Sequence, residues 1–320
     1  MGGLGGQRLG TTIRNHEWNR SVPMIVHLVD GTYELYRQHY GQAVRSSAPD
    51  PNAATIGVLN STLQLLQEGA THLGVATDHV IESFRNDLWD GYKTSEGMEP
   101  EILTQIPIVE EALRSMGVTV WAMEEYEADD ALASAAAVAA ADPTVTRVLI
   151  LSPDKDLGQC VVGDRVVQID RRKMSKGEDG LVNEAAVIAK FGVPPSSIAD
   201  YLGLVGDTAD GFPGLSGWGA KSAAAVLARY GHIEHIPDAA GQWEVPGLRG
   251  APKLATSLRE NRQLALLFRR IATTVNTVPV GAVADWHWNG PTADFADFCD
   301  DLGAPRLAEK AAGLARSRGR

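Results

Sequence analysis

Acidic residues recur just after the apolar stretches of this 320-residue chain. Five apolar runs are each followed by carboxylates within a few positions, and these carboxylates are Asp30, Asp78, Glu127, Asp129, Asp130, Asp154, Asp156, Asp207 and Asp210. In a parallel sheet, strand ends of one polarity lie along one edge, so acids at those ends converge. Such a cluster repels itself unless cations neutralise it. The spacing therefore predicts a divalent-metal site with a catalytic role.

Each acidic group also has a simpler explanation when it is considered alone. Residues 127–130 could form only the acidic first turn of a helix, where carboxylates interact favourably with the helix dipole. Asp154 could cap a helix together with its neighbour. Asp207 and Asp210 could satisfy the amides of a turn. Five coincidences at successive ends of elements favour the metal site over these separate explanations.

The types of ligand indicate the metal and the reaction. The predicted ligands include no His or Cys, and hard oxygen ligands suit Mg²⁺ or Mn²⁺ rather than Zn²⁺. Two such ions about 3.5–4 Å apart can activate water and stabilise both the entering and the leaving oxygen of an in-line displacement. Mg²⁺ also tends to meet its substrate through phosphate oxygens. The acids therefore predict phosphodiester hydrolysis.

The segment 79–98 fits neither a helix nor a strand pattern well, and we expect it to cross over the acidic edge. One set of its side chains forms an apolar stripe that could belong to an ordinary amphipathic helix: Phe84, Leu88 and Trp89. The others could grip a phosphodiester and stack on an unpaired base: Arg85, Tyr92 and Lys93. We expect the first set to pack and the second to face a substrate.

A glycine-rich turn spans residues 214–222. It does not match a P-loop, because Lys221 arrives one residue late and no strand precedes the turn. A turn of this kind before a helix start can offer backbone N–H groups to a phosphate, which in a helical region suits a nucleic-acid backbone. A tight turn between helices explains the glycines equally well, so both interpretations remain open here.

Length and composition limit the class of protein. A hydrophobic content of 44% over 320 residues suits one large or two moderate domains. No stretch approaches the ~20 apolar residues that span a membrane, so we expect no membrane partner. Residues 1–23 lack the apolar core of a signal peptide and are expected to form a disordered extension. Cys160 and Cys299 have no metal or disulfide spacing, which fits a reducing cytoplasm.

The net charge of −11, with a pI near 5.2, at first sight argues against a nucleic-acid partner. However, nine of the acids belong to the predicted site, where bound cations would offset part of their charge. Basic residues also concentrate within 165–176, 249–270 and 316–320, although these clusters could be solvated faces. The net charge therefore does not decide the partner.

The elements that must position the acids alternate in type over the first half of the chain. Short apolar runs predict strands near 24–29, 72–77, 118–121, 147–151 and 166–169. Helices are expected near 53–68, 99–116, 127–141, 184–191, 196–203, 219–230 and 254–271, with 292–316 mostly helical. This order predicts an α/β domain over 24–180 and a helical domain over 181–320.

Several of these motifs occur together in the order found in one known family. They are Val29-Asp30-Gly31, Phe84-Arg85, Tyr92-Lys93, Glu127-Ala128-Asp129-Asp130, Asp154-Lys155-Asp156 and Gly206-Asp207-x-x-Asp210. From about residue 24 to about residue 280 the chain resembles the 5′ nucleases, which include flap endonucleases, phage 5′ exonucleases and the N-terminal nuclease domain of bacterial DNA polymerase I. The resemblance implies a PIN-like (resolvase-like), mostly parallel sheet flanked by helices. It also implies a helix–three-turn–helix element at about 200–235 in the helical domain.

The resemblance further implies a structure-specific 5′ nuclease. Its partner would be DNA with a 5′ flap, a nick or a 5′ end, or an RNA–DNA hybrid. Cleavage would leave a 5′-phosphate and a 3′-hydroxyl, in flap or primer removal during replication and repair. Two or three Mg²⁺ or Mn²⁺ ions would be the cofactors, and the protein would act as a cytoplasmic monomer. No polymerase domain follows, so a stand-alone enzyme is expected.

Individual roles carry over onto the matching positions. One metal would be surrounded by Asp30, Asp78, Glu127, Asp129, Asp130 and Asp154, and a second would be completed by Asp156, Asp207 and Asp210. The catalytic set implied is Lys93, Arg85, Asp30 and Asp154, with Lys93 and Arg85 on the scissile phosphate. Tyr92 would stack on a base, and Arg37 would lie at the gateway to the active site. Further DNA contacts would come from Gly217, Gly219, Lys221, Ser222, Arg249 and Lys253, with K⁺ at the helix–three-turn–helix.

The chain departs from the family pattern in three places. Thr94 to Gly97 follow Tyr92-Lys93 where a further Arg is common, Pro153 replaces a small residue, and Gly211 stands where many members carry Asn. None of these changes removes a predicted ligand.

Three alternatives fit the sequence less well. A PIN-like ribonuclease would not need the glycine-rich turn or the helical domain. A haloacid-dehalogenase-type phosphatase would need an acid where Leu28 stands. A non-catalytic flap-binding module would be expected to have lost ligands.

Overall fold

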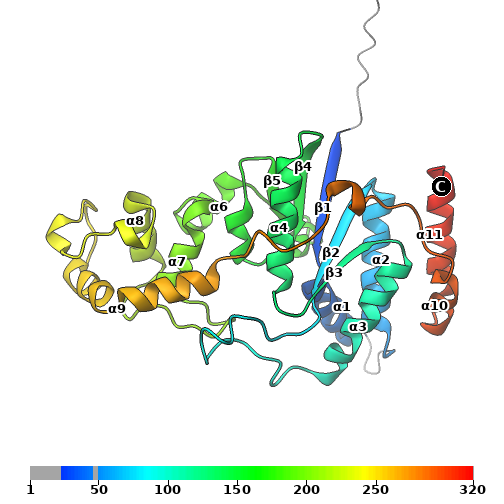
Figure 1. Ribbon diagram of the computed structural model, residues 1–320, viewed down its shortest axis with the longest axis horizontal. Helices are drawn as coiled ribbons and strands as arrows, with labels where there is room; N and C mark the ends of the chain where they lie inside the picture. Colours follow the sequence, from blue (N-terminus) through cyan, green and yellow to red (C-terminus); the bar gives the residue numbers. More distant parts are fainter. Residues whose placement is uncertain (1–22, 46–49, 320) are drawn as a thin grey trace, which may run out of the picture.

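The computed structural model describes residues 23–45 and 50–319, and for 42–45 only the backbone. The expected extension 1–23 therefore lies outside the described residues, apart from Pro23. The molecule is elongated, with a sheet and its flanking helices at one end and a group of helices at the other (Figure 1). No helix in the described ranges has the length and apolar character needed to cross a membrane.

A six-stranded sheet forms the core of the first unit, in the order β3-β2-β1-β4-β5-β6. The strands are β1 (Met24–Asp30), β2 (His72–Asp78), β3 (Thr119–Met123), β4 (Val145–Leu151), β5 (Val166–Ile169) and β6 (Leu181–Val182). All neighbours pair in parallel except β5 and β6, which are antiparallel. Val29 pairs with both Val75 and Leu151, so the carboxyl ends of three central strands lie level.

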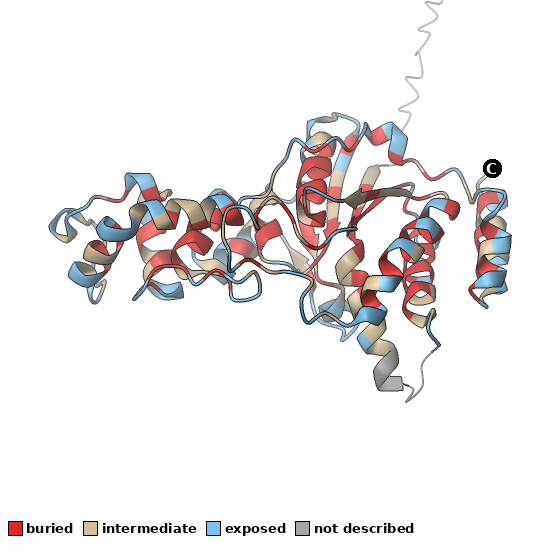
Figure 2. Cartoon of the chain, turned by 60° about the horizontal axis from the view of Figure 1, so that its bottom comes forward, coloured by how far each residue is buried: buried red, intermediate tan, exposed pale blue. Residues whose placement is uncertain are grey.

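Helices cover both faces of this sheet. One face carries α1 (Gly31–Arg45), α2 (Ala53–Gln67) and α3 (Pro100–Ser115), and the other carries α4 (Ala128–Ala141). The alternation of side chains along β1 supplies both layers, since Val29 packs with the first set and Leu28 with α4. α4 is Ala-rich, which favours helix formation and close approach to the sheet. Buried residues accordingly line the sheet and the inward sides of these helices (Figure 2).

The second unit is helical and has its own core. After the short α5 (Arg171–Met174) come α6 (Glu184–Phe191), α7 (Ile198–Val205), α8 (Ala220–Tyr230) and α9 (Ala251–Ala272). Their apolar faces bury Leu204, Phe212 and Phe268 together. α7 packs along α9, and the segment from α7 to α8 returns through the glycine-rich turn.

The last part of the chain lies apart from the helical unit, although the sequence predicted a helical domain over all of 181–320. After α9 it crosses back along the sheet domain, and α10 (Phe295–Asp301) and α11 (Pro305–Ser317) pack beside α3 and α2 (Figure 1). Trp288 Nε1 donates to Met116 O at 2.9 Å, and Thr292 N donates to Ser115 O at 2.8 Å. The physical reason is apolar burial, because Trp288 is only 1% exposed within the core shared with α2 and α3.

Candidate metal centre

The carboxyl ends of β1, β2 and β4 and the start of α4 enclose an acidic cleft of about 180 Å³. Its lining residues are Asp30, Thr32, Tyr33, Tyr36, Asp78, Lys93, Glu127, Asp129 and Asp154. Five of the nine predicted acids thus meet in one place, together with Lys93. The acids converge because the carboxyl ends of the parallel strands β1, β2 and β4 lie at the same level of the sheet. The spacing of the acids in the sequence predicts this arrangement.

A second acidic group joins the sheet domain to the helical unit. Asp156 lies just after the β4 loop, whereas Asp207 and Asp210 follow α7, and carboxylate oxygens of all three lie within 4.8 Å of one another. Asp156 Oδ1 is buried and has no hydrogen-bond partner among the described residues. Because a buried charged oxygen without a partner is costly, this atom marks a place for a cation.

Burial and mutual repulsion raise the pKa values of several of these acids. Burial raises the pKa of Asp30 to about 7, and the charges of Asp78 and Asp154 add to the effect. Burial likewise raises the pKa of Asp210 to about 6, with a further contribution from Asp207. Asp30 and Asp210 are therefore poorly neutralised by the protein's own cations.

The donor set fits divalent cations with a preference for oxygen. The two groups supply carboxylate oxygens, and one of these, Asp156 Oδ1, has no hydrogen-bond partner among the described residues. The negative charges of the carboxylates also repel one another in a buried setting. Mg²⁺ and Mn²⁺ prefer such ligands. The cleft and the group of Asp156, Asp207 and Asp210 are therefore two adjoining places for cations.

Lys93 bridges these two places. Its Nζ lies 3.0 Å from Glu127 Oε2 in the cleft and 3.1 Å from Asp210 Oδ1 in the second group. Burial opposes the charge of Lys93, but Glu127 and Asp210 hold its pKa well above the usual value. The side chain is 35% exposed and lines the cleft, so it places a charged ammonium beside both groups of carboxylates.

Arg85 and Asp130 are placed in the interior, away from a substrate. Arg85 is 3% exposed and donates from Nη1 and Nη2 to Asp130 at 2.7 and 2.8 Å, and from Nε to Ile271 O at 2.8 Å. Asp130 is fully buried and also accepts from the backbone N–H groups of Glu127 and Val275. Because of these hydrogen bonds, the carboxylate of Asp130 is not available to bind a metal. The guanidinium of Arg85 is likewise not available to bind a phosphate. Both residues tie segment 79–98 to α4 and α9, in place of the roles expected from the motifs.

Tyr92 is also more buried than expected. Its ring is 4% exposed in the core of the helical unit, and its hydroxyl donates to Glu127 Oε2 at 3.1 Å. This arrangement orients a metal-site carboxylate and leaves no ring face for stacking on a base. Of the predicted apolar stripe, Leu88 and Trp89 pack against the same core, whereas Phe84 lies outside it and contacts Tyr126 edge to face.

We expect Arg85→Met to destabilise the protein strongly, because it leaves Asp130 as an uncompensated buried charge. The free energy of unfolding, measured by denaturant titration, should fall by about 3–5 kcal/mol. Arg259→Met is the control, since its 3.9 Å ion pair with Glu260 is exposed on both sides and should be worth less than about 1 kcal/mol. If Arg85→Met instead kept the wild-type stability but cleaved more slowly, Arg85 would be assigned to substrate contact rather than to structure.

The departure at Gly211 has a structural reason. Its φ is +81°, and a Cβ there would lie 2.0 Å from Gly91 O. At this point Lys93 N donates to Asp210 O at 3.1 Å, and Trp89 Nε1 donates to Gly211 O at 3.1 Å. Segment 79–98 is therefore clamped onto the Asp207–Asp210 loop, and only glycine permits the approach.

Further residues of the site escaped the sequence analysis. Ser152 Oγ donates to Asp30 Oδ2 at 2.8 Å, and Thr32 Oγ1 accepts from Asp78 N at 2.8 Å. Lys155 Nζ pairs with Asp207 Oδ2 at 2.5 Å. Each lies within two positions of a predicted ligand, which is the signal that could have identified it.

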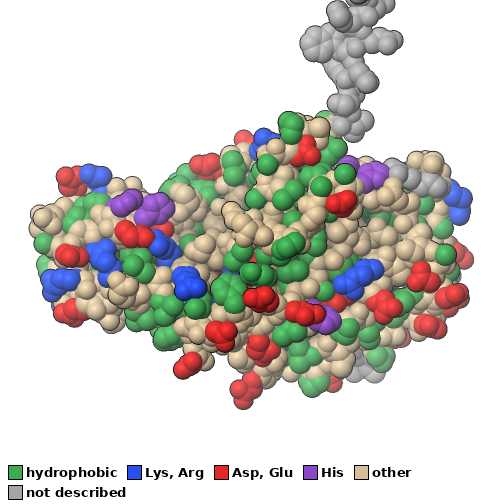
Figure 3. Space-filling view, viewed as in Figure 1, with side chains coloured by type: hydrophobic (Ala, Val, Ile, Leu, Met, Phe, Trp, Pro, Cys, Tyr) green, Lys and Arg blue, Asp and Glu red, His purple; other side chains and the backbone are tan. Residues whose placement is uncertain are grey.

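The residues predicted to bind DNA in the helical unit lie together at the starts of α8 and α9. Two adjoining grooves, of about 750 and 610 Å³, share Gly217, Ser222 and Arg249 among their lining residues. Lys253 lines the first groove, and Gly219 and Lys221 line the second. Lys and Arg side chains are frequent over this end of the molecule (Figure 3). Arg37 is separate, because it pairs with Glu34 and does not line the acidic cleft.

Comparison with known families agrees with this architecture. Residues 25–192 match the N-terminal resolvase-like domain of 5′-3′ exonucleases, and residues 193–294 match the C-terminal SAM fold of the same enzymes. The 5′-3′ exonuclease of Aquifex aeolicus is 34% identical over 214 residues, which cover 66% of this chain and 71% of that protein. DNA polymerase I of Bacillus caldotenax is 31% identical over 258 residues, or 79% of this chain. The match spans only 28% of that polymerase.

Solved structures share the fold at low sequence identity. The T5 D15 protein co-crystallised with metal ions has a TM-score of 0.61 at 17% identity, covering 91% of this chain and 99% of that one. The catalytic core of Rad2 in complex with DNA substrate has a TM-score of 0.59 at 16% identity, covering 91% and 92%. The predicted fold class and the suggested family are confirmed. The chain belongs to the 5′-3′ exonuclease family.

Proposed function

We propose that this protein is a divalent-metal-dependent 5′ nuclease that hydrolyses DNA at 5′ flaps and 5′ ends. The products would carry a 5′-phosphate and a 3′-hydroxyl, and the role would be flap or primer removal in replication and repair. The observation that carries the proposal is the pair of adjoining carboxylate groups bridged by Lys93. We further propose that the protein acts as a monomer in the cytoplasm.

The acids would divide between two cations, either Mg²⁺ or Mn²⁺. The first would be held by Asp30, Asp78, Glu127, Asp129 and Asp154, and the second by Asp156, Asp207 and Asp210, with some ligands shared. When bound, such ions activate water and stabilise the charge of a phosphodiester displacement. Asp130 is omitted from the proposed ligands because Arg85 occupies it.

The protein's own groups would position the substrate and compensate its charge. Glu127 and Asp210, which pair with Lys93 Nζ, are themselves proposed ligands. When Glu127 and Asp210 bind cations, the ammonium of Lys93 becomes available to a non-bridging oxygen of the scissile phosphate. There it would stabilise the negative charge that develops during cleavage. Tyr92 and Ser83 would hold Glu127 in place through their hydroxyl groups.

The helical unit would bind the duplex beside the cleavage site. The start of α8 presents backbone N–H groups after Gly219, with Lys221 and Ser222 beside them. Arg249 and Lys253 flank the same surface. These groups suit backbone phosphates, and we propose that a monovalent cation such as K⁺ occupies the Gly217–Gly219 turn.

Substrate preference tests the proposed function. We expect rapid cleavage of a 5′-flap duplex, slower cleavage of nicked and 5′-ended duplexes, and little cleavage of unstructured single strands. Matched substrates with an RNA primer, each assayed with Mg²⁺ and with Mn²⁺, separate this function from that of a PIN-like ribonuclease. Efficient cleavage of single-stranded RNA with no activity on flaps would favour the ribonuclease. Flap binding without cleavage under all metal conditions would favour a non-catalytic module.

The stability of the metal-free protein should fall as the pH rises from about 5 to about 8. The reason is that Asp30 and Asp210 have folded-state pKa values of about 7 and about 6, raised above their ordinary value of 3.8. Protonated carboxyls are therefore favoured by folding, and this stabilisation is lost as they ionise. Melting temperatures measured in EDTA should show the decline, and Mg²⁺ or Mn²⁺ should reverse it.

The double variant Asp30→Asn, Asp210→Asn is the control for this dependence. Its metal-free melting temperature should change less between the same pH values, because two of the titrating carboxyl groups are gone. A metal-free wild-type melting temperature that rises over this range would contradict the proposed electrostatics.

A further inference from the structure

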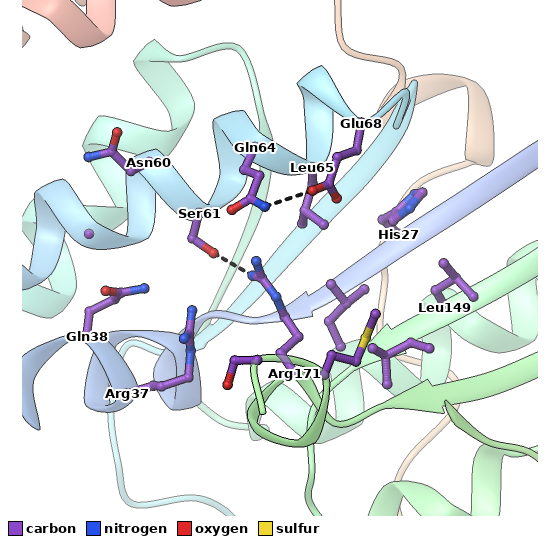
Figure 4. Close-up of a pocket in the computed structure, with 15 residues that line it drawn as sticks. His27, Arg37, Gln38, Asn60, Ser61, Gln64, Leu65, Glu68, Leu149 and Arg171 are labelled. Carbon is purple, nitrogen blue, oxygen red and sulfur yellow. Dashed lines mark hydrogen bonds between the residues drawn. The ribbon is translucent and has the colours of Figure 1, made fainter. Parts of the chain in front are cut away.

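A second cavity, of about 630 Å³, opens on the face of the sheet that carries α1 and α2 (Figure 4). Its apolar floor comes from Leu149 and Leu151 of β4 and Ile169 of β5, and its walls come from α1, α2 and α5. It shares no lining residue with the acidic cleft. Two elements contribute to both sites. β1 places Asp30 on the cleft and His27 in the cavity, and α1 places Tyr36 on the cleft and Arg37 in the cavity.

Two guanidinium groups enter this cavity and share one carboxylate. Arg37 donates from Nε and Nη2 to Glu34 at 2.9 and 2.5 Å, whereas Arg171 Nη1 lies 3.7 Å from the same Glu34. Figure 4 shows both side chains reaching from below toward α2. Burial lowers the pKa of Arg171, Glu34 opposes this effect, the charge of Arg37 lowers the pKa further, and the charge of Glu68 raises it. Arg37 and Arg171 therefore share a single paired carboxylate on this wall, and the other acid, Glu68, lines the cavity from the end of α2.

The guanidinium of Arg171 is only partly satisfied. Within the described ranges, its one hydrogen bond to a protein acceptor runs from Nη1 to Ser61 Oγ at 2.5 Å, which leaves the other donors of its fork free. The remaining acid of the cavity, Glu68, accepts a hydrogen bond from Gln64 at 2.7 Å on the same helix. An anion between Arg37 and Arg171 would thus meet unused donors and relieve their repulsion.

His27 gives an independent sign of a missing partner. It lies on β1 among the residues that line the cavity, and its Nδ1 is buried without a hydrogen-bond partner in the described part of the chain. A buried ring nitrogen without a partner is costly, and a polar ligand atom could satisfy it. The cavity therefore combines an apolar floor, a cationic wall and an unpaired polar atom.

We propose that this cavity binds a nucleotide, with its phosphate on Arg37 and Arg171 and its base over the apolar floor. The volume falls within the range of small-ligand sites, which are mostly apolar with a few placed polar groups. The nucleotide could be a free nucleoside monophosphate or the 5′-terminal nucleotide of a strand, since both present the same chemistry. The proposal does not depend on cleavage in the acidic cleft.

Calorimetric titration of the full chain with deoxyadenosine 5′-monophosphate in EDTA tests the proposal. Without divalent cations the acidic cleft repels phosphates, so binding there does not contribute. We expect deoxyadenosine and inorganic phosphate each to bind at least about tenfold more weakly than the nucleotide. Arg171→Met should weaken nucleotide binding by about tenfold or more. Lys173→Met, on the same helix but exposed and outside the cavity, should change it by less than about twofold.

Circular dichroism would verify that each variant is folded. If Arg171→Met is not, Arg171→Lys keeps the charge but loses the planar fork, and should still weaken binding severalfold. A 5′-phosphorylated dinucleotide that binds more tightly than the monophosphate would assign the site to a strand end, and the reverse order would assign it to the free nucleotide. The proposal is overturned if the wild type does not bind the nucleotide or if folded Arg171 variants bind it equally well. Inorganic phosphate binding as tightly as the nucleotide would also overturn it.

Discussion

Asp154→Ala and Asp207→Ala should each abolish metal-dependent cleavage. Asp154 lines the acidic cleft, and Asp207 belongs to the second carboxylate group, so each change removes a ligand from a different proposed cation. Single-turnover rates on a 5′-flap substrate should fall by about 10³-fold or more, because the two ions act as a unit. DNA affinity should change little, because the proposed duplex-binding residues lie at the starts of α8 and α9.

Asp297→Asn is the matched control, since it removes an equal charge from an exposed position on α10. It should cleave at the wild-type rate. Full activity in either ligand variant would remove the basis for a two-cation site. Loss of both cleavage and DNA binding, with altered circular dichroism, would indicate misfolding, and Asp154→Asn and Asp207→Asn would then replace the alanine variants.

Lys93→Ala should slow the chemical step by about 10²–10³-fold without loss of metal binding. The ammonium faces both carboxylate groups at 3.0 and 3.1 Å, where it can stabilise charge that develops on a phosphate. Its removal also frees Glu127 and Asp210 from an ion pair, so cation affinity should be retained or increased. Single-turnover kinetics and Mn²⁺ titration would measure the two effects separately.

Lys310→Ala on α11 serves as the control for this variant, because it removes an exposed lysine from another part of the fold. A Lys93→Ala rate equal to the wild-type rate would refute the role in transition-state stabilisation. A loss of metal affinity equal to the loss of rate would instead make Lys93 a residue that organises the carboxylates.

The sheet and the meeting of the acids could be predicted because they follow from local patterns. Short apolar runs followed by carboxylates define parallel strands and their common edge, and β1, β2, β4 and β5 lie within two residues of their expected bounds. The fixed polarity of the strands then brings Asp30, Asp78 and Asp154 together. No long-range information is needed for this step.

The direction of side chains in segment 79–98 could not be predicted in the same way. The segment has no regular periodicity, so its contacts are decided by distant parts of the chain. Arg85 binds the carbonyls of Ile271 and Thr273, which are more than 180 positions away in the sequence. Likewise, the return of 275–319 to the sheet domain depends on burial of Trp288 beside α3. Motifs identified these residues, but only tertiary packing shows which of them face solvent.

Anomalous diffraction from crystals equilibrated with Mn²⁺ would test the two-cation centre most directly. The expected result is one peak among Asp30, Asp78, Glu127, Asp129 and Asp154, and a second among Asp156, Asp207 and Asp210. Asp207→Ala should remove the second peak and leave the first. The absence of any peak at these carboxylates, in crystals of protein that cleaves flaps with Mn²⁺, would contradict the account.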